Sequence, residues 1–142
     1  MTTVQQILDA KGHDIYFVRP DDTVLHALQM MERRNVGAML VKEDDTLVGI
    51  FTERHYARKV FLKGRSSPKT RIGEVMESNV VYVEPGQNAE ACMALMIDKR
   101  IRHLPVLRDG RLVGLISIGD LMKSIIADRE FNIEQLVRYV QG

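Results

Sequence analysis

A single cysteine, Cys92, occurs in the 142 residues of the chain. One thiol excludes an internal disulfide and a cysteine-based zinc site, and it is typical of a reducing compartment. Cys92 lies among apolar residues with a helical pattern. Two interpretations are open there, a buried thiol and a reactive thiol. The absence of basic flanking residues favours the buried thiol.

Excess charge and long apolar runs are also absent. The formal net charge is +1, so no broad basic surface for nucleic acid is expected. The longest stretch without Asp, Glu, Lys or Arg, residues 23–31, is too short to span a bilayer. The first residues lack the basic and apolar regions of a signal peptide. We therefore expect a cytoplasmic protein with no nucleic-acid or membrane partner.

What the sequence does contain is an internal repeat. Sliding the chain by 65 residues aligns 18–62 with 83–127 without a gap, with eight of the 45 positions identical and apolar character matched almost throughout. Each copy has the pattern of strand, helix, strand, strand and helix. This predicts an α+β fold in which two repeats pack about a pseudo-two-fold axis. The expected parts are repeat 1 at 1–62, a linker at 63–71, repeat 2 at 72–127 and a C-terminal helix at 128–142.

Local signals place the elements of each copy. β-rich runs ended by proline predict strands at 15–18 and 80–83. The next helices are expected to be capped by Asp22 or Thr23 in repeat 1, and by Asn88 in repeat 2. Asp109-Gly110 predicts a tight hairpin turn. Segments 54–62 and 120–128 are expected to form the closing helices.

Two further segments leave alternatives open. The basic segment 63–71 fits a solvated linker or a nucleic-acid contact, and the linker is favoured. At the C-terminus, Ile133, Leu136, Val137 and Val140 form one stripe of a short helix. That helix is expected to cover the core or a subunit contact.

The end of the last strand carries an unusual group, Ser117-Ile118-Gly119-Asp120. A helix N-terminus there would offer free N–H groups and a partial positive charge to a phosphate. The Ser117 hydroxyl is a further donor, and the Asp120 carboxylate can accept two hydrogen bonds from the vicinal hydroxyls of a ribose. These residues predict a nucleotide site without catalysis. The alternative is structural, with Ser117 as an N-cap and Asp120 as a first-turn carboxylate.

The sequence also resembles a known family. The repeat containing "RHLPVLRDGRLVGLISIGDLM" is similar to a CBS (cystathionine β-synthase) domain, and two in tandem resemble a CBS pair, or Bateman module. The resemblance implies a regulatory module that binds adenosyl ligands: AMP, ADP, ATP, NAD(H) or S-adenosylmethionine. It also implies a homodimer and an effector protein, here unidentified, that reads the ligand state.

The resemblance implies two clefts, each formed by both repeats. In the first, Ser117 would bind phosphate and Asp120 ribose, with Lys11 and Arg54 reaching the phosphates. Its base walls would be Ile15, Tyr16, Gly37, Ala38 and Ile116. The second cleft would use Thr52 and His55, with walls from Val80, Val81, Arg102, His103 and Pro105. The alternative for Arg102 is a surface arginine on the rim, and the cleft wall is favoured.

The second cleft departs from the family pattern at one position. His55 stands where the family has the ribose-binding aspartate. A neutral imidazole accepts one hydrogen bond and cannot hold both hydroxyls of a ribose. We therefore expect one strong cleft, and one that is weaker or differently selective.

No catalytic constellation is recognisable, and the four histidines are not spaced as metal ligands, so neither an enzyme nor a metal site is expected. Two other functions stay open. One is a structural interaction module with vestigial clefts, which His55 favours and the Ser117–Asp120 pair opposes. The other is a slow nucleotide hydrolase, which the lack of a general base opposes.

Overall fold

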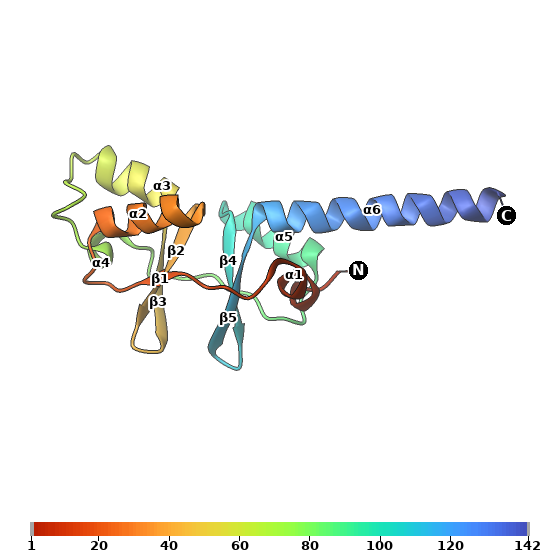
Figure 1. Ribbon diagram of the computed structural model, residues 1–142, viewed down its shortest axis with the longest axis horizontal. Helices are drawn as coiled ribbons and strands as arrows, with labels where there is room; N and C mark the ends of the chain where they lie inside the picture. The colour runs from red at the N-terminus through yellow and green to blue at the C-terminus, as the bar shows by residue number, and fades with distance from the viewer. Residues whose placement is uncertain (1, 142) are drawn as a thin grey trace. The chain divides into compact units, whose positions relative to one another are not determined.

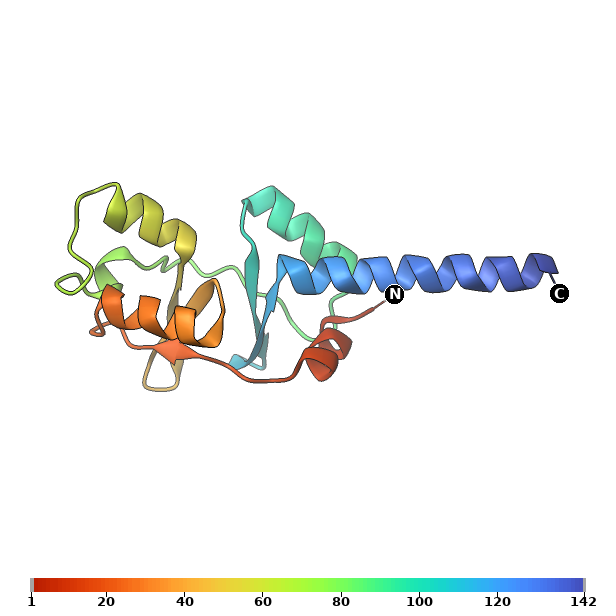
Figure 2. The ribbon, with the colours of Figure 1, turned by 45° about the horizontal axis from the view of Figure 1, so that its top comes forward.

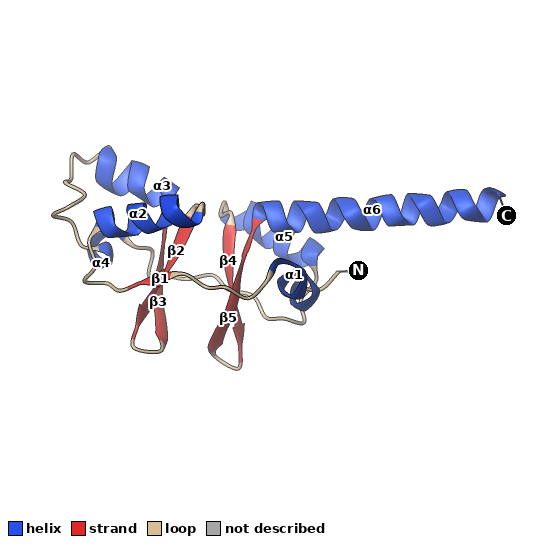
Figure 3. Ribbon diagram, in the orientation of Figure 1, coloured by secondary structure: helices blue, strands red, loops and turns tan. Residues whose placement is uncertain are grey.

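The computed structural model describes residues 2–141, in an α+β fold of two compact units (Figures 1 and 3). Unit 1 combines the segment up to Asp14 with the segment from Val81 onward, and unit 2 is Ile15–Val80. The units therefore do not coincide with the sequence repeats. The first residues of the chain pack with the second repeat, and residues 63–80 pack with the first.

Unit 2 holds a three-stranded sheet in the order β1-β2-β3. β1 runs parallel to β2, which pairs antiparallel with β3 so that Leu40 faces Ile50. The elements are β1 (Phe17–Val18), α2 (Val24–Arg34), β2 (Ala38–Glu43), β3 (Thr46–Thr52), α3 (Glu53–His55), the π-helix η1 (Tyr56–Phe61) and α4 (Ile72–Val75).

Unit 1 holds the antiparallel pair β4–β5, in which His103 faces Ser117. Val83 adds one parallel bridge to Val106. The elements are α1 (Val4–Lys11), α5 (Ala89–Lys99), β4 (His103–Arg108), β5 (Arg111–Ser117) and α6 (Ile118–Gln141).

The helix that precedes each repeat in sequence packs with the opposite repeat. α1 precedes repeat 1 but belongs to unit 1, which holds repeat 2, and α4 precedes repeat 2 but belongs to unit 2, which holds repeat 1. α1 joins unit 1 through a bridge between Thr3 and Asn88, and α4 joins unit 2 through the matching bridge between Arg71 and Thr23. The sequence analysis did not predict either helix. The Thr3-x-x-Gln6 capping box is the signal that marks the start of α1.

Gly114 of β5 allows α1 to approach the sheet closely. A Cβ atom at this position would lie 2.5 Å from Cδ2 of Leu8. Gly49, the matching residue of β3, is equally crowded, with Sδ of Met76 at 2.6 Å from its would-be Cβ. The repeated glycine therefore accommodates the segment that packs across each strand.

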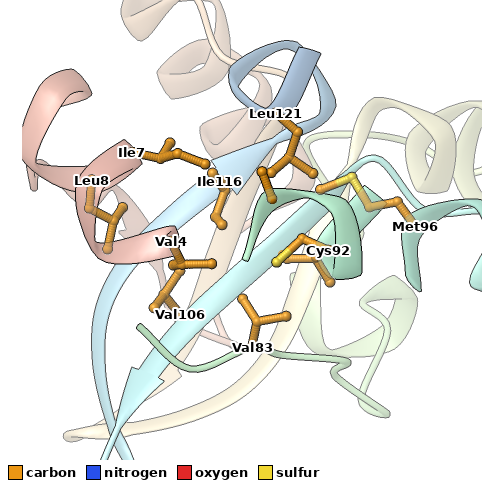
Figure 4. Packing of buried hydrophobic residues seen from close by; sticks show 11 residues of the cluster. Val4, Ile7, Leu8, Val83, Cys92, Met96, Val106, Ile116 and Leu121 are labelled. Carbon is orange, nitrogen blue, oxygen red and sulfur yellow. The ribbon is translucent and has the colours of Figure 1, made fainter. Parts of the chain in front are cut away.

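The core of unit 1 lies between α1, α5 and the two strands (Figure 4). α1 contributes Leu8 and α5 contributes Cys92, both essentially inaccessible to solvent. Burial raises the pKa of the Cys92 thiol, which confirms the buried-thiol interpretation. The fully buried side chains of this core also include Val4, Val83, Ala89, Leu104, Val106, Ile116 and Leu121.

The predicted helix starts and hairpin turn are confirmed. Oγ1 of Thr23 accepts a hydrogen bond from the His26 amide at 3.1 Å, and Oδ1 of Asn88 accepts one from Ala91 at 2.8 Å. Asp109 and Gly110 both have positive φ, 51° and 79°, as their turn requires.

The predicted first strands are mostly wrong. Segment 15–18 is a strand only over Phe17–Val18, and segment 80–83 makes one bridge, at Val83. β-propensity marks these runs correctly as extended. Extended backbone becomes a strand only where a neighbour supplies hydrogen bonds, and here few positions have such a partner.

Both closing helices also differ from prediction. After α3, the helix of repeat 1 continues as η1, where the Leu62 amide bonds to the Ala57 carbonyl at 3.0 Å. The π-helical turn brings Tyr56 and Phe61, five residues apart, to a ring-centroid distance of 6.4 Å. In repeat 2 the closing helix does not end before the C-terminal helix; both are α6, because no Gly or Pro interrupts 120–141.

The end of α6 does not cover the core of unit 1. Ile133, Leu136, Val137 and Val140 are all exposed. The prediction that this helix covers the core is therefore wrong. Its other predicted role, a subunit contact, stays a prediction.

The linker is only partly solvated. Residues 63–66 are exposed, but Thr70 is buried and its carbonyl accepts a hydrogen bond from Val24 at 2.9 Å. The Ser67 carbonyl binds the next amide, that of Leu25, at 3.0 Å. The linker thus satisfies two free N–H groups at the start of α2.

Candidate functional site

Ser117 and Asp120 form a reciprocal cap at the start of α6. The Asp120 amide donates to Oγ of Ser117 at 3.2 Å, and the Ser117 amide donates to Oδ2 of Asp120 at 2.8 Å. The structural interpretation of these residues as helix caps is therefore correct. It does not exclude a ligand, because the cap holds both side chains at the mouth of the helix.

Lys11, at the end of α1, joins this pair. Its Nζ donates to Oδ2 of Asp120 at 2.7 Å and to the Leu115 carbonyl at 2.9 Å. α1 is held against β5 by Leu8, which packs over Gly114. The family resemblance implies that Lys11 reaches phosphates. In the structure it binds the carboxylate that was expected to bind ribose.

The Asp120 carboxylate is ionised at neutral pH. Partial burial by itself raises its pKa, but hydrogen bonds from Lys11 and Ser117 and the charge of Lys11 bring the pKa below the ordinary value. The Lys11 ammonium and the Ser117 amide both donate to Oδ2.

His103 and Arg102 lie beside this group. His103 pairs with Ser117 across the β4–β5 ladder, and the Arg102 carbonyl accepts a hydrogen bond from Ile118 at 2.9 Å. Burial lowers the pKa of His103, and the charge of Lys11 lowers it further, against an opposing effect of Asp120. The imidazole is therefore neutral at pH 7. The lysine and arginine leave the group with basic character.

Repeat 1 has the same cap with a different residue. The His55 amide donates to Oγ1 of Thr52 at 3.3 Å, and the Thr52 amide donates to Nδ1 of His55 at 3.1 Å. The Gly37 carbonyl binds the Glu53 amide, as the Arg102 carbonyl binds Ile118. The single acceptor nitrogen of a neutral His55 is thus already used by the backbone.

The charges around His55 differ from those around Asp120. Burial lowers the pKa of His55, and Lys59 and Arg54 lower it further, while Glu77 raises it. Glu77 follows α4 and binds Ile50 of β3 through two backbone hydrogen bonds, of 2.9 and 3.0 Å. The proximity of Glu77 to His55 does not follow from the sequence, because only the packing of α4 on β3 brings the two residues together.

The remaining predicted residues divide between the units. Arg102, His103, Pro105, Val81 and Ile116 belong to unit 1, and Ile15, Tyr16, Gly37, Ala38, Arg54 and Val80 belong to unit 2. In unit 2 the Tyr16 ring lies 4.8 Å from the Arg34 guanidinium carbon, and Ala38 is buried. That residues of both units form each cleft stays a prediction.

A cavity of about 560 Å³ lies elsewhere in unit 1. It is lined by Thr2, Gln6, Glu90, Ile125, Asp128, Arg129, Phe131 and Asn132. Thr2 donates to the Asp128 carboxylate across it at 2.8 Å. None of the predicted site residues lines this cavity, so the candidate site depends on the chemistry of the β5–α6 junction.

Residues 2–141 contain neither a candidate metal site nor a candidate membrane span. No cluster of three or more His, Cys, Asp or Glu in that range could hold a metal ion. In the same range, no helix has both the length and the apolar character needed to cross a membrane.

The CBS domain family matches the chain twice, at residues 6–61 and 72–127. The chain belongs to the CBS-domain family. One relative is the mitochondrial CBS domain-containing protein CBSX3 of Arabidopsis thaliana. It is 37% identical to this chain over 150 residues, and the match covers 99% of this chain and 73% of the relative. The solved structure of a CBS-domain protein from Burkholderia ambifaria MC40-6 is 55% identical, with a TM-score of 0.87, covering 89% of this chain and 96% of that chain.

A more distant CBS domain pair shares the fold alone. Protein MJ0100, solved with 5-methylthioadenosine and S-adenosyl-L-methionine, is 22% identical to this CBS chain. Its TM-score is 0.79, covering 90% of this chain and 98% of that chain.

Proposed function

We propose that this CBS-domain chain is a regulatory sensor that binds an adenine nucleotide or related adenosyl ligand at the β5–α6 junction. The observation that carries the proposal is the Asp120 carboxylate, ionised and held at the mouth of α6 by Lys11 and Ser117. Oδ1 would accept hydrogen bonds from the ribose hydroxyls. The Ser117 hydroxyl and the N-terminus of α6 would receive the phosphate.

Lys11 would change partner when such a ligand binds. In the structure it forms an ion pair with Asp120. Ribose hydroxyls bound to the carboxylate would weaken that ion pair, and an anionic phosphate would offer the ammonium a second partner. This favours phosphorylated adenosyl ligands, AMP, ADP, ATP or NAD(H), over S-adenosylmethionine. The solved structure of MJ0100 supports an adenosyl compound as the ligand, since that protein of the same fold was solved with two such compounds.

Regulation would follow from linkage. A ligand that binds one conformation more tightly increases the population of that conformation, and an effector protein that distinguishes the conformations responds. The effector is unidentified. The proposal assigns the chain no chemical step and no metal. It includes a cytoplasmic location, because a single free cysteine is typical of a reducing compartment.

Thermal unfolding with AMP, ADP, ATP, NAD(H) and S-adenosylmethionine tests the proposal. A ligand at 100 times its dissociation constant stabilises the protein by about 2.7 kcal/mol, which raises the midpoint by roughly 5–15 °C. Asp120→Asn keeps an acceptor for the Ser117 amide but loses the charge. It should weaken binding by about ten- to a hundredfold.

Asp98→Asn is the matched control, because Asp98 is an exposed carboxylate of α5. An equal ligand shift in Asp120→Asn and Asp98→Asn would show that the ribose site is misplaced.

A structural interaction module is the second candidate. It is favoured by one observation: Ser117, Asp120 and Lys11 are hydrogen-bonded to one another. Wild-type protein that shows no shift with any compound of the panel would support this alternative. Turnover of ATP during the same incubation would instead indicate the hydrolase.

A further inference from the structure

The outer half of α6 has an apolar surface that unit 1 does not cover. Figures 1 and 2 both show α6 continuing as one helix beyond α1, α5 and the strands of its own unit. Every residue from 129 to 141 is exposed. A helical segment of this length is marginal alone in water, so packing against another surface would stabilise it.

Five exposed apolar residues of α6 follow a regular spacing, and Phe131, Val137 and Tyr139 lie outside it. Met122, Ile126, Ile133, Leu136 and Val140 are 50%, 51%, 62%, 63% and 76% exposed. With Arg129 they are spaced 4, 3, 4, 3 and 4 residues apart, which is the a/d repeat of a two-stranded coiled coil. We call these six positions the α6 stripe. It extends over about 27 Å, from the body of unit 1 to the end of the helix.

The one charge in the α6 stripe decides the orientation of a pair. In a parallel pair, Arg129 would face Arg129 of the second copy, which is a buried like-charge contact. In an antiparallel pair, residues whose numbers sum to 262 face one another. Met122 then meets Val140, Ile126 meets Leu136, and Arg129 meets Ile133.

We propose that two copies of this chain pair through the α6 stripe, with the two helices antiparallel. All six positions find a partner in this register, and a shift of one heptad in either direction leaves stripe residues unpaired. Glu130, three residues before Ile133, brings a carboxylate close to Arg129 of the other copy. The stripe is thus complementary to itself in both apolar spacing and charge, which is what a two-fold contact requires.

This pairing gives the expected homodimer a specific surface. It does not depend on ligand binding, since the α6 stripe and the Ser117–Asp120 group use different residues. Failure of one proposal therefore leaves the other intact.

Sedimentation velocity of the full chain tests the contact. Leu136→Asp places a charge in the middle of the outer stripe and should raise the dissociation constant of the pair at least tenfold. Gln135→Asp adds the same charge at the neighbouring exposed position, outside the stripe, and should leave the assembly unchanged. Equal sedimentation of wild type and Leu136→Asp would overturn the proposal and leave the stripe to another protein.

Cysteine cross-linking tests the orientation without disturbing the helix. An oxidised mixture of an Ile126→Cys chain and a Leu136→Cys chain should give a cross-linked dimer containing one of each. Either variant alone should give none, because identical positions lie about ten residues, or 15 Å, apart along an antiparallel pair. Wild-type protein, whose Cys92 is buried, controls for other thiol chemistry. Cross-linking of each variant with itself would overturn the antiparallel arrangement.

Discussion

Removing the charge of Asp120 should destabilise the protein even without ligand. Asp120→Asn retains an oxygen for the Ser117 amide but cannot form the ion pair with Lys11. The pair is short, at 2.7 Å, and the side chains are 36% and 19% exposed. Because it is only partly desolvated, it should contribute near the top of the surface range, about 1 kcal/mol.

Two further variants separate the ion pair from the helix cap. Asp120→Ala also removes the oxygen that accepts from Ser117, and loss of a cap costs about 1 kcal/mol more. Lys11→Met should cost about as much as Asp120→Asn, and the double variant should cost little more than either. That non-additivity is the coupling energy of the pair, measured by urea unfolding followed by circular dichroism.

The effect has a definite pH dependence. The pKa of Asp120 is lower in the folded protein than in the unfolded chain, so the unfolded chain binds the proton more tightly. The stabilisation is fully present above the ordinary carboxyl pKa, near 4, and is lost as the pH falls through the folded value. The difference in unfolding free energy between wild type and Asp120→Asn should be constant from pH 7 to 5 and disappear in stronger acid.

Glu134→Gln is the matched control. It breaks an exposed ion pair of 2.9 Å with Arg138 on the outer part of α6 and should cost less than about 0.5 kcal/mol. If Asp120→Asn costs no more than Glu134→Gln at pH 7, or if its deficit does not diminish as the pH falls below 4, then Asp120 is not held by Lys11 as the structure indicates.

Three other experiments have definite expected outcomes. His55→Asp gives repeat 1 the carboxylate of repeat 2 and should raise the stoichiometry of nucleotide binding in calorimetry from one to two; an unchanged stoichiometry would show that His55 does not cause the asymmetry. Gly114→Ala forces its Cβ against Leu8 and should destabilise the protein by about 1–3 kcal/mol in urea, whereas a neutral result would mean that α1 is not packed on β5. Native Cys92 should react with a thiol reagent far more slowly than in urea, because it is buried and its pKa is raised; equal rates would contradict its place in the core.

Periodicity made most of the fold predictable. The buried face of α2 is formed by Val24, Ala27 and Met31, as the helical spacing indicates, and the hairpin turn forms at Asp109-Gly110. The predicted strands at 15–18 and 80–83 failed because strand formation depends on a neighbour that the local sequence does not specify. The π-helical turn after His55 was equally hidden, since it depends on how Tyr56 and Phe61 pack.

The candidate site was predictable in its residues but not in its contacts. Ser117-x-x-Asp120 and the exception at His55 follow from the repeat, which compares each position with its counterpart. The pairing of Lys11 with Asp120 does not follow, because the two residues are 109 positions apart and meet only through the docking of α1 on β5.

By itself, the sequence determined the duplication, the order of most helices and strands, and which residues stand at each strand-to-helix junction. These features are encoded in spacings of a few residues and in the choice of caps and turns. Only the tertiary structure decided that the helix before each repeat packs with the opposite repeat. As a result, Lys11 neutralises Asp120, and Glu77 lies near His55. Such contacts join distant segments through complementary packing, and no local pattern of residues specifies the partner.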